Sequence, residues 1–229
     1  MTAKPYAHRG LHDRKAGIIE NSMSAFRAAI AAGYAIECDV QASADGVAMV
    51  FHDAVLDRVA GRSGHVAELT ATELEAVALT DGDVGIRSLS DHLRLVGGRV
   101  PIVIELKGDG ANKRLLPKAV AEALAQYDGD ASVMSFDPDL TATFSDLMPE
   151  RPRGLTAEGG DEFGDDYRGA MLDGDLQFVS YARTDLACAF VTQCRAEGVP
   201  VISWTIRSPE QAAESALYAD QITFEGFRP

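Results

Sequence analysis

The fold is decided by one stretch of the sequence, AIECDVQASADGVAMVFH at residues 35–52. It begins with a short apolar run, Ala35–Val40, that is interrupted by two acidic residues. Because the side chains of a strand alternate between its two faces, Glu37 and Asp39 lie on one face while Cys38 points to the other. We therefore expect a buried strand that carries two carboxylates on the same side.

A β-hairpin is predicted directly after this strand. The following residues leave no room for a crossover helix, and Asp45-Gly46 stands between two alternating runs. Asp-Gly is a strong hairpin signal because a type I′ turn requires positive φ at both central residues. With these two residues as the turn, the arm Val47–His52 runs antiparallel to the strand and its last residue lies opposite Asp39.

Short runs of the same kind recur along the whole chain. Eight apolar or β-branched runs predict strands at Pro5–His8, Ala35–Val40, Val100–Leu106, Ala131–Phe136, Arg153–Thr156, Gln177–Tyr181, Pro200–Thr205 and Asp220–Phe224. Helical spacing occurs between them at Met23–Ile30, Ala71–Leu79, Ser88–Val96, Leu115–Ala125, Ala187–Ala196 and Pro209–Leu217. Strands that alternate with helices predict an α/β protein whose parallel sheet is covered on both faces.

The number of strands and the length of the chain favour a (β/α)₈ TIM barrel. In this interpretation a β-hairpin and a short insertion, about residues 42–87, follow the second strand. A doubly wound open sheet is the alternative, because periodicity does not show that a sheet closes. No Gly-, Ser- or Pro-rich linker divides the sequence, so we expect a single domain over residues 1–229.

The composition excludes several classes of protein. The 229 residues contain 21 Lys and Arg against 35 Asp and Glu, a net charge of −14, which argues against binding nucleic acid or an anionic membrane surface. No apolar run approaches the ~20 residues of a membrane span, and residues 1–10 lack the apolar core of a signal peptide. We therefore expect no stable membrane association. Cys38, Cys188 and Cys194 form no CxxC pair and leave an odd cysteine over, so we expect a protein of the reducing cytoplasm. The oligomeric state stays open, a homo-oligomer included.

Charged and polar side chains stand at the carboxyl ends of the first three strands and of the hairpin arm. They are His8 and Arg9 after the first strand, Glu37 and Asp39 in the second, His52 at the end of the arm, and Glu105 and Lys107 in the third strand. Barrel enzymes build their active sites at this end of the strands. Each residue alone has a structural explanation, such as a rim salt bridge or a hydrogen-bonded histidine. Their coincidence at consecutive strand ends favours a functional site.

The residue types indicate the chemistry of this site. Three carboxylates cannot share one small volume unpaired, so either one of them stays protonated or the site needs a cation. Oxygen ligands suit a hard divalent ion such as Mg²⁺ or Ca²⁺. A site that also holds an arginine and a lysine attracts an anion, with phosphate as the leading candidate. The two histidines are suited to carry protons.

Other polar residues have simpler interpretations. Asn21 precedes the first predicted helix, and an N-cap explains it without any chemistry. His12, His65 and His92 have no charged companions at strand ends, so we expect them at the surface.

The residues named above resemble a known family, the glycerophosphodiester phosphodiesterases. The matching pieces, in the order of the family, are Ala7-His8-Arg9-Gly10, Glu20-Asn21-Ser22, Ile36-Glu37-Cys38-Asp39-Val40, Asp45-Gly46 with His52-Asp53, Ile104-Glu105-Leu106-Lys107, Ser135-Phe136 and Trp204-Thr205. The resemblance implies a (β/α)₈ barrel that hydrolyses a glycerophosphodiester to glycerol 3-phosphate and an alcohol. The chain departs from the family at Thr223-Phe224-Glu225, where many relatives read Thr-Asp.

The resemblance also implies a role for each candidate residue. Glu37, Asp39 and Glu105 match the ligands of one divalent metal ion, and His8 and His52 match the general acid/base pair. Arg9 and Lys107 match the phosphate-binding cations, and Trp204 matches an aromatic residue near the substrate pocket.

Two other functions are weighed against this expectation. The same barrel could act on lysophospholipids or sphingolipids, as a lysophospholipase D or sphingomyelinase D does, but residues 54–87 offer no apolar or basic lip for a lipid. A barrel that only binds a phosphorylated ligand has no use for paired proton carriers. The head-group alcohol, the metal, the assignment of acid and base, and the choice between water and the glycerol 2-hydroxyl as nucleophile remain open.

Overall fold

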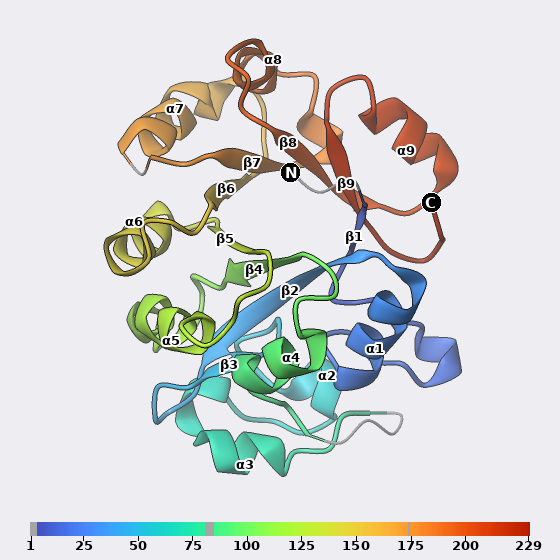
Figure 1. Cartoon of the computed structure of the whole chain (residues 1–229), viewed down its shortest axis with the longest axis vertical. Helices are drawn as coiled ribbons and strands as arrows, with labels where there is room; N and C mark the ends of the chain where they lie inside the picture. The colour runs from blue at the N-terminus through green and yellow to red at the C-terminus, as the bar shows by residue number, and fades with distance from the viewer. Residues whose placement is uncertain (1–3, 81–84, 174) are drawn as a thin grey trace.

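Eight parallel strands close into a barrel in the computed structural model, which describes residues 4–80, 85–173 and 175–229 (Figure 1). The strands are β1 (Tyr6–Ala7), β2 (Ala35–Ala42), β4 (Ile102–Leu106), β5 (Ala131–Ser135), β6 (Arg153–Ala157), β7 (Phe178–Ala182), β8 (Val201–Ile206) and β9 (Gln221–Phe224). Tyr6 of β1 pairs with both Ala35 of β2 and Thr223 of β9. These pairings close the sheet, so the predicted TIM barrel is confirmed and the open sheet is wrong.

A helix follows each of the first seven barrel strands and packs against the outside of the barrel (Figure 1). These helices are α1 (Met23–Ala32), α4 (Leu89–Val96), α5 (Leu116–Leu124), α6 (Pro138–Leu147), α7 (Gly164–Asp173), α8 (Ala189–Ala196) and α9 (Pro209–Ser215). Short 3₁₀ turns lie at Arg14–Ala16, Val66–Glu68, Lys113–Leu115, Asp161–Phe163 and Arg183–Asp185. None of the helices in the described part of the chain is both long and apolar enough to cross a membrane.

Two of these helices, α6 and α7, have no counterpart among the predicted ones. The start of α6 carries a local signal, because Asp137 accepts a hydrogen bond from the backbone of Asp139 and Pro138 occupies the first turn. Its buried residues include Leu140 and Phe144, four positions apart on one face. In contrast, α7 begins with a glycine and two aspartates, which are poor helix formers, and it has few apolar residues at helical spacing.

The interior of the barrel changes from apolar to polar along its axis. One layer of interior side chains is apolar and consists of Tyr6, Ala35, Val103, Met134, Phe178 and Ile202. Two residues further along the same strands, where the side chains again face inward, stand His8, Glu37, Glu105, Phe136, Ser180 and Trp204. The polar side chains at the carboxyl end of the barrel therefore lie directly above an apolar layer of its interior.

The predicted hairpin is present, but the predicted pairing of its two strands is wrong by one residue. Strand β3 (Ala48–Val50) runs antiparallel to β2, with Val40 opposite Val50. This register sets Asp39 opposite Phe51, whose N–H donates to the Asp39 carbonyl at 3.0 Å, rather than opposite His52. His52 thus follows the paired part of the arm.

The register differs because the loop has three residues instead of two. Ser43 and Val47 close the loop through a backbone hydrogen bond of 3.0 Å, and Gly46 within it has φ 79°. The carboxylate of Asp45 accepts hydrogen bonds from the Ser43 hydroxyl at 2.6 Å and from the Ala71 N–H at 2.9 Å. These bonds stabilise a three-residue loop whose last residue is left-handed, a common hairpin form.

The insertion after the hairpin has a small apolar core of its own. It contains α2 (Asp57–Ala60) and α3 (Ala71–Glu75), and its core includes Leu56, Leu74 and Ile86. Residues 81–84 of the predicted insertion lie outside the described residues, as do residues 1–3 and 174. In Figure 1 the insertion covers the barrel beside β2 and β3.

Candidate active site

A pocket of about 330 Å³ opens at the carboxyl ends of the barrel strands. All eight candidate residues line it, namely His8, Arg9, Glu37, Asp39, His52, Glu105, Lys107 and Trp204. A larger hollow of about 840 Å³ has Tyr6, Phe178 and Ile202 in its wall, at the amino ends of the strands, and none of the eight candidates lines it. The structure therefore brings the predicted residues together at the end of the barrel where such enzymes act.

Three buried carboxylates form the floor of this pocket. Glu37, Asp39 and Glu105 are 2%, 1% and 7% exposed, and one oxygen of each lies within 4.8 Å of the others. Asp39 pairs with Glu105 in the parallel register of β2 and β4, and Glu37 is two residues earlier on the same face as Asp39. Three oxygen donors at this spacing fit a hard divalent cation.

The electrostatics of the carboxylates also favour the binding of a positive charge. Burial, together with the charges of Asp39 and Glu105, raises the pKa of Glu37 well above its ordinary value. Burial and Asp39 raise the pKa of Glu105 to about 7. Burial alone would also raise the pKa of Asp39, but Arg9 and other cations lower it to about 2. The cluster is thus one in which added positive charge stabilises the ionised carboxylates.

Two cationic side chains stand beside the carboxylates. The Lys107 Nζ donates to Glu105 Oε1 at 2.8 Å and lies 3.7 Å from Asp39 Oδ1. The Arg9 Nε lies 3.3 Å from Asp39 Oδ2, while its backbone N–H donates to Glu37 Oε2 at 2.9 Å. Both cations therefore face the pocket from the side of the carboxylates.

The turn that carries Arg9 depends on the glycine after it. Gly10 has φ 76°, and a Cβ at this position would lie 2.8 Å from the Ala25 Cβ and 2.9 Å from the Ala25 backbone carbon. Only glycine fits such a close approach to α1. The His8-Arg9-Gly10 turn consequently lies against the start of this helix.

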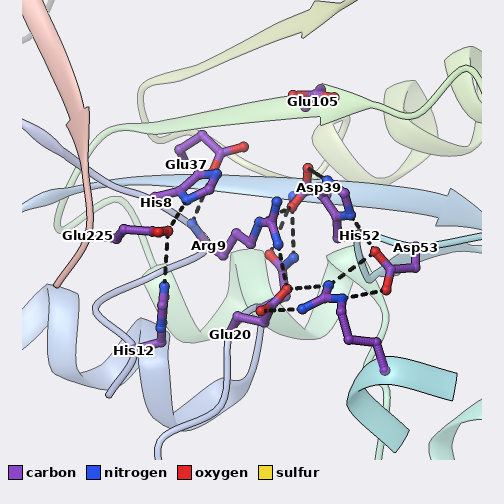
Figure 2. A network of polar contacts seen from close by, with 12 residues as sticks. His8, Arg9, His12, Glu20, Glu37, Asp39, His52, Asp53, Glu105 and Glu225 are labelled. Carbon is purple, nitrogen blue, oxygen red and sulfur yellow. Dashed lines mark hydrogen bonds and ion pairs between the residues drawn. The ribbon is translucent and has the colours of Figure 1, made fainter. Parts of the chain in front are cut away.

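His52 reaches the pocket from the end of the hairpin arm. Its Nδ1 bonds Asp53 Oδ1 at 2.6 Å, and Arg58 Nε donates to Asp53 Oδ2 at 2.7 Å (Figure 2). Its Nε2 lies 3.2 Å from Lys107 Nζ and 4.0 Å from Asp39 Oδ1. The ring is therefore held on one edge by a carboxylate and presents the other edge to the pocket.

His8 occupies the equivalent position on the other side of the carboxylates. Its Nε2 lies 3.9 Å from Glu37 Oε2, and its Nδ1 bonds Glu225 Oε2 at 2.5 Å (Figure 2). Burial lowers the pKa of His8, and the hydrogen bond to Glu225 acts in the opposite direction. Sequence reasoning missed Glu225 as a partner of His8; its only signal was an acidic residue directly after the last strand.

Asn21 is not the helix cap that the sequence suggested. Ser22 is the N-cap of α1, because its side chain accepts the Ala25 N–H. Asn21 has φ 58°, and its Nδ2 donates to Asp39 Oδ2 at 2.9 Å while its Oδ1 accepts the Asp39 N–H at 3.3 Å. An asparagine in this left-handed conformation thus orients one of the three carboxylates.

The neighbouring residue, Glu20, also belongs to the site. Its carboxylate accepts a hydrogen bond from Arg9 Nη1 at 2.6 Å and two from Arg58 at 2.8 Å each. Burial would raise the pKa of Glu20, but the Arg58 hydrogen bonds and Arg9 lower it to about 2. Glu20 therefore links Arg9, which lies beside Asp39, to Arg58, which holds Asp53.

Two of the three histidines expected at the surface lie elsewhere. His92 is fully buried on α4, where its ring packs edge-on against Phe26 with a centroid distance of 4.4 Å. His12 is half-buried, with Nε2 3.6 Å from Glu225 Oε2. His65 alone is exposed. Their neighbours come from distant parts of the chain, which a local pattern does not reveal.

The wall opposite the carboxylates carries hydroxyl groups and aromatic rings. Thr156, Ser180 and Thr223 line the pocket, and their buried hydroxyls have no hydrogen-bond partner in the described part of the chain. Trp204 lies beside Phe136, with ring centroids 5.7 Å apart, and Phe136 is 45% exposed. The pocket therefore has a charged half from β1, β2 and β4 and a hydroxyl-aromatic half from β5 to β9, to which Arg207 after β8 adds one charge.

Comparison with known proteins identifies relatives of this chain. The model of the Glycerophosphoryl diester phosphodiesterase family matches residues 8–223. A glycerophosphodiester phosphodiesterase of Bacillus altitudinis is 33% identical over 157 residues, which cover 64% of this chain and 63% of that protein. A second, from Caldanaerobacter subterraneus subsp. tengcongensis, is 36% identical over 107 residues, which cover 45% of this chain and 40% of that protein. The chain thus spans less than two thirds of the length of these relatives.

Solved structures share the fold. A phosphodiesterase of Oleispira antarctica, in complex with the product sn-glycerol-3-phosphate, superposes with a TM-score of 0.82 at 21% identity, covering 96% of this chain and 91% of that one. A glycerophosphodiester phosphodiesterase of Thermotoga maritima superposes with a TM-score of 0.78 at 23% identity, covering 98% and 95%. At these identities the likeness concerns the barrel itself.

Proposed function

Since the chain belongs to the glycerophosphoryl diester phosphodiesterase family, we propose that it hydrolyses glycerophosphodiesters to glycerol 3-phosphate and an alcohol. The observation that carries this proposal is the pocket in which two imidazoles, from His8 and His52, flank three buried carboxylates. The product complex of the Oleispira antarctica phosphodiesterase, a protein of the same fold, supports glycerol 3-phosphate as the product.

The carboxylate cluster is the proposed binding site of one divalent cation. Glu37, Asp39 and Glu105 supply only oxygen donors, and we propose Mg²⁺ or Ca²⁺ as the ion. The raised pKa values of Glu37 and Glu105 support this proposal, because a bound positive charge would stabilise their ionised forms. When bound, such an ion acts as a Lewis acid on a phosphoryl oxygen. Asn21 contributes by holding Asp39 through its amide.

The other residues bind the phosphate and move protons. We assign Arg9 and Lys107 to the phosphate oxygens, where their charges stabilise the transition state more than the ground state. One imidazole Nε2 removes a proton from the attacking nucleophile, either water or the glycerol 2-hydroxyl, and the other gives a proton to the leaving oxygen. His8 and His52 suit this pair because they approach the carboxylates from opposite sides (Figure 2).

The aromatic half of the pocket supports a small alcohol rather than a lipid. Trp204 and Phe136 provide one aromatic wall, but large exposed apolar side chains are not found in the insertion, as far as its residues are described. A lipid substrate needs a wider apolar surface beside the pocket. We therefore rank water-soluble glycerophosphodiesters above lysophospholipids.

Release of glycerol 3-phosphate from glycerophosphocholine tests the proposal. We expect turnover with Mg²⁺ or Ca²⁺, its loss in EDTA, and its return when the ion is restored. Lysophosphatidylcholine in the same assay should be turned over far more slowly. Full activity in EDTA would remove the metal from the mechanism, and faster turnover of the lysolipid would favour the lipid substrate.

Histidine variants test the proton carriers in the same assay. We expect His8→Ala and His52→Ala to lose at least about 10²-fold in kcat while they unfold at nearly the wild-type temperature. His65→Ala is the matched control, because this histidine is exposed in the insertion, and it should keep full activity. Near-normal kcat in both pocket variants would contradict the assignment.

The proposed setting of the enzyme is a reducing compartment such as the cytoplasm. Cys38, Cys188 and Cys194 are all buried free thiols, which suits such a compartment. The proposed partner is the small-molecule phosphodiester, and we propose that residues 1–229 form a single catalytic domain in which the insertion belongs to the barrel.

A further inference from the structure

We propose that Glu225 is a positioning residue, which fixes the tautomer and the orientation of His8. Glu225 directly follows β9 and reaches across to the end of β1 (Figure 2). This inference rests on the proposed function, because it concerns an imidazole to which we assign proton transfer.

The hydrogen bond itself determines which nitrogen of His8 carries the proton. Glu225 Oε2 lies 2.5 Å from His8 Nδ1, and an ionised carboxylate only accepts hydrogen bonds. Nδ1 must therefore be the donor in the neutral ring, which leaves the lone pair on Nε2. That nitrogen points toward the carboxylate cluster, 3.9 Å from Glu37 Oε2.

Glu225 is itself held in place from its other side. Arg207 Nε donates to Glu225 Oε1 at 2.7 Å, and His12 Nε2 lies 3.6 Å from Oε2. Each carboxylate oxygen thus has at least one nitrogen beside it, so rotation of the carboxylate would break an existing contact. A carboxylate that is held in this way transmits its orientation to the ring that it contacts.

The other pocket histidine has the same arrangement, in which a carboxylate bonds the imidazole Nδ1 and an arginine holds the carboxylate. His52 Nδ1 bonds Asp53, and Asp53 is held by Arg58 Nε at 2.7 Å. The two arrangements come from unrelated segments of the chain, yet both turn an imidazole Nε2 toward the pocket. In contrast, His92 is outside the pocket and its Nδ1 bonds a backbone carbonyl, that of Ser88, at 3.0 Å.

The Glu225 side chain is not needed to join the first and last strands. Backbone bonds already do this, since the His8 N–H donates to the Phe224 carbonyl at 2.9 Å and Tyr6 pairs with Thr223. The Glu225 N–H in turn donates to the Ile206 carbonyl at 2.9 Å. Because the backbone holds the strand ends, the side-chain bond is free to serve the imidazole.

A Glu225→Gln variant tests the role with little change of shape. The glutamine amide can donate a hydrogen bond to His8 Nδ1, which favours the tautomer with the proton on Nε2. In that tautomer Nε2 has no lone pair toward the pocket and cannot accept a proton. We expect kcat for glycerophosphocholine to fall about 10²-fold or more, with KM within about threefold of wild type. Glu225→Asp keeps the carboxylate and should recover part of the loss. Glu214→Gln, an exposed glutamate on α9, is the matched control and should match wild type.

Nitrogen-15 NMR of the histidine side chains supplies a readout independent of turnover. We expect His8 to show the Nδ1–H tautomer in wild type and to lose it in Glu225→Gln, with the His8 signals assigned by their absence in His8→Ala. An unchanged tautomer and kcat in Glu225→Gln would overturn the proposal. So would a variant that melts at a lower temperature but has wild-type kcat when folded, because Glu225 would then be structural. Absence of glycerol 3-phosphate release by wild type would instead overturn the proposed function, while the tautomer would still be measured.

Discussion

His92 shows how a single buried residue makes the stability of the protein depend on pH. The ring is fully buried, and its Nδ1 bonds the Ser88 carbonyl. Burial lowers the pKa of His92 from 6.5 to about 4. Unfolding exposes the ring to water and restores its ordinary pKa, so the unfolded chain binds the proton more tightly than the folded one.

We predict that the free energy of unfolding falls as the pH is lowered from about 6.5 to about 4. Between these values the unfolded ring is protonated while the folded ring is neutral, and the contribution of His92 to the loss amounts to about 3 kcal/mol at the acid end. Above pH ~6.5 the contribution is complete and constant. Urea unfolding at a series of pH values measures the slope.

The matched control for this prediction is the exposed histidine of the insertion. His92→Leu should show a shallower fall of stability between pH 6.5 and 4 than wild type, whereas His65→Leu should keep the wild-type slope. Equal slopes in wild type and His92→Leu would contradict the assignment.

The hairpin of β2 and β3 illustrates what a turn residue contributes to an element. Gly46 is the last residue of its loop and has φ 79°, while a Cβ there would meet only Leu115 Cδ1 at the ordinary distance of 3.6 Å. Space is therefore available for a side chain, and the only cost of substitution is the left-handed backbone.

We predict that Gly46→Ala lowers the free energy of unfolding by about 1 kcal/mol. Gly46→Asn should lower it less, because asparagine tolerates the left-handed region better than alanine. Urea unfolding curves of the two variants beside wild type measure the difference. A cost for Asn that equals or exceeds the cost for Ala would show that backbone conformation is not the cause.

The sequence predicted the elements better than the contacts between them. The ends of β5 and β9 are within one residue of their predicted positions, because apolar runs and their flanking turns are local signals. The hairpin register was wrong because a loop of three residues depends on bonds from Asp45 to Ser43 and to the distant Ala71.

The same difference between local signals and tertiary contacts applies to the candidate site. His8 and Glu105 could be found because each stands at the end of an apolar run. Glu225 as the partner of His8, and Asn21 as the partner of Asp39, could not, since both pairings arise only when the chain has folded. A local pattern identifies the residues at strand ends but not the tertiary hydrogen bonds that orient them.

At the scale of the whole molecule, closure of the barrel joins residues that are far apart in the sequence. Tyr6 of β1 pairs with Ala35 and with Thr223, so the first strand must find both the second and the last. The eight predicted strands indicated a barrel, but only these pairings show that it is closed. Contacts of such long sequence separation form slowly because the entropy of loop closure opposes them.

We predict that activity returns later than secondary structure during refolding from urea. Helices and neighbouring strands form from local contacts, whereas His8 acquires its partner Glu225, 217 residues away, only after β1 and β9 have met. Far-UV circular dichroism and glycerol 3-phosphate release, followed in the same refolding reaction, compare the two rates. Simultaneous recovery of both signals would show that closure is not the late step.

The two halves of the pocket have a consequence for how such an enzyme can evolve. The residues to which we assign the chemistry lie between His8 and Lys107, whereas the hydroxyl-aromatic wall comes from the later strands, from Phe136 to Thr223. On the proposed function, recombination at a single point between β4 and β5 would therefore exchange the wall to which we assign the alcohol and leave the proposed catalytic residues in place. The incoming half would have to supply a last strand that pairs with β1 and an acidic residue within reach of His8, as Thr223 and Glu225 do here.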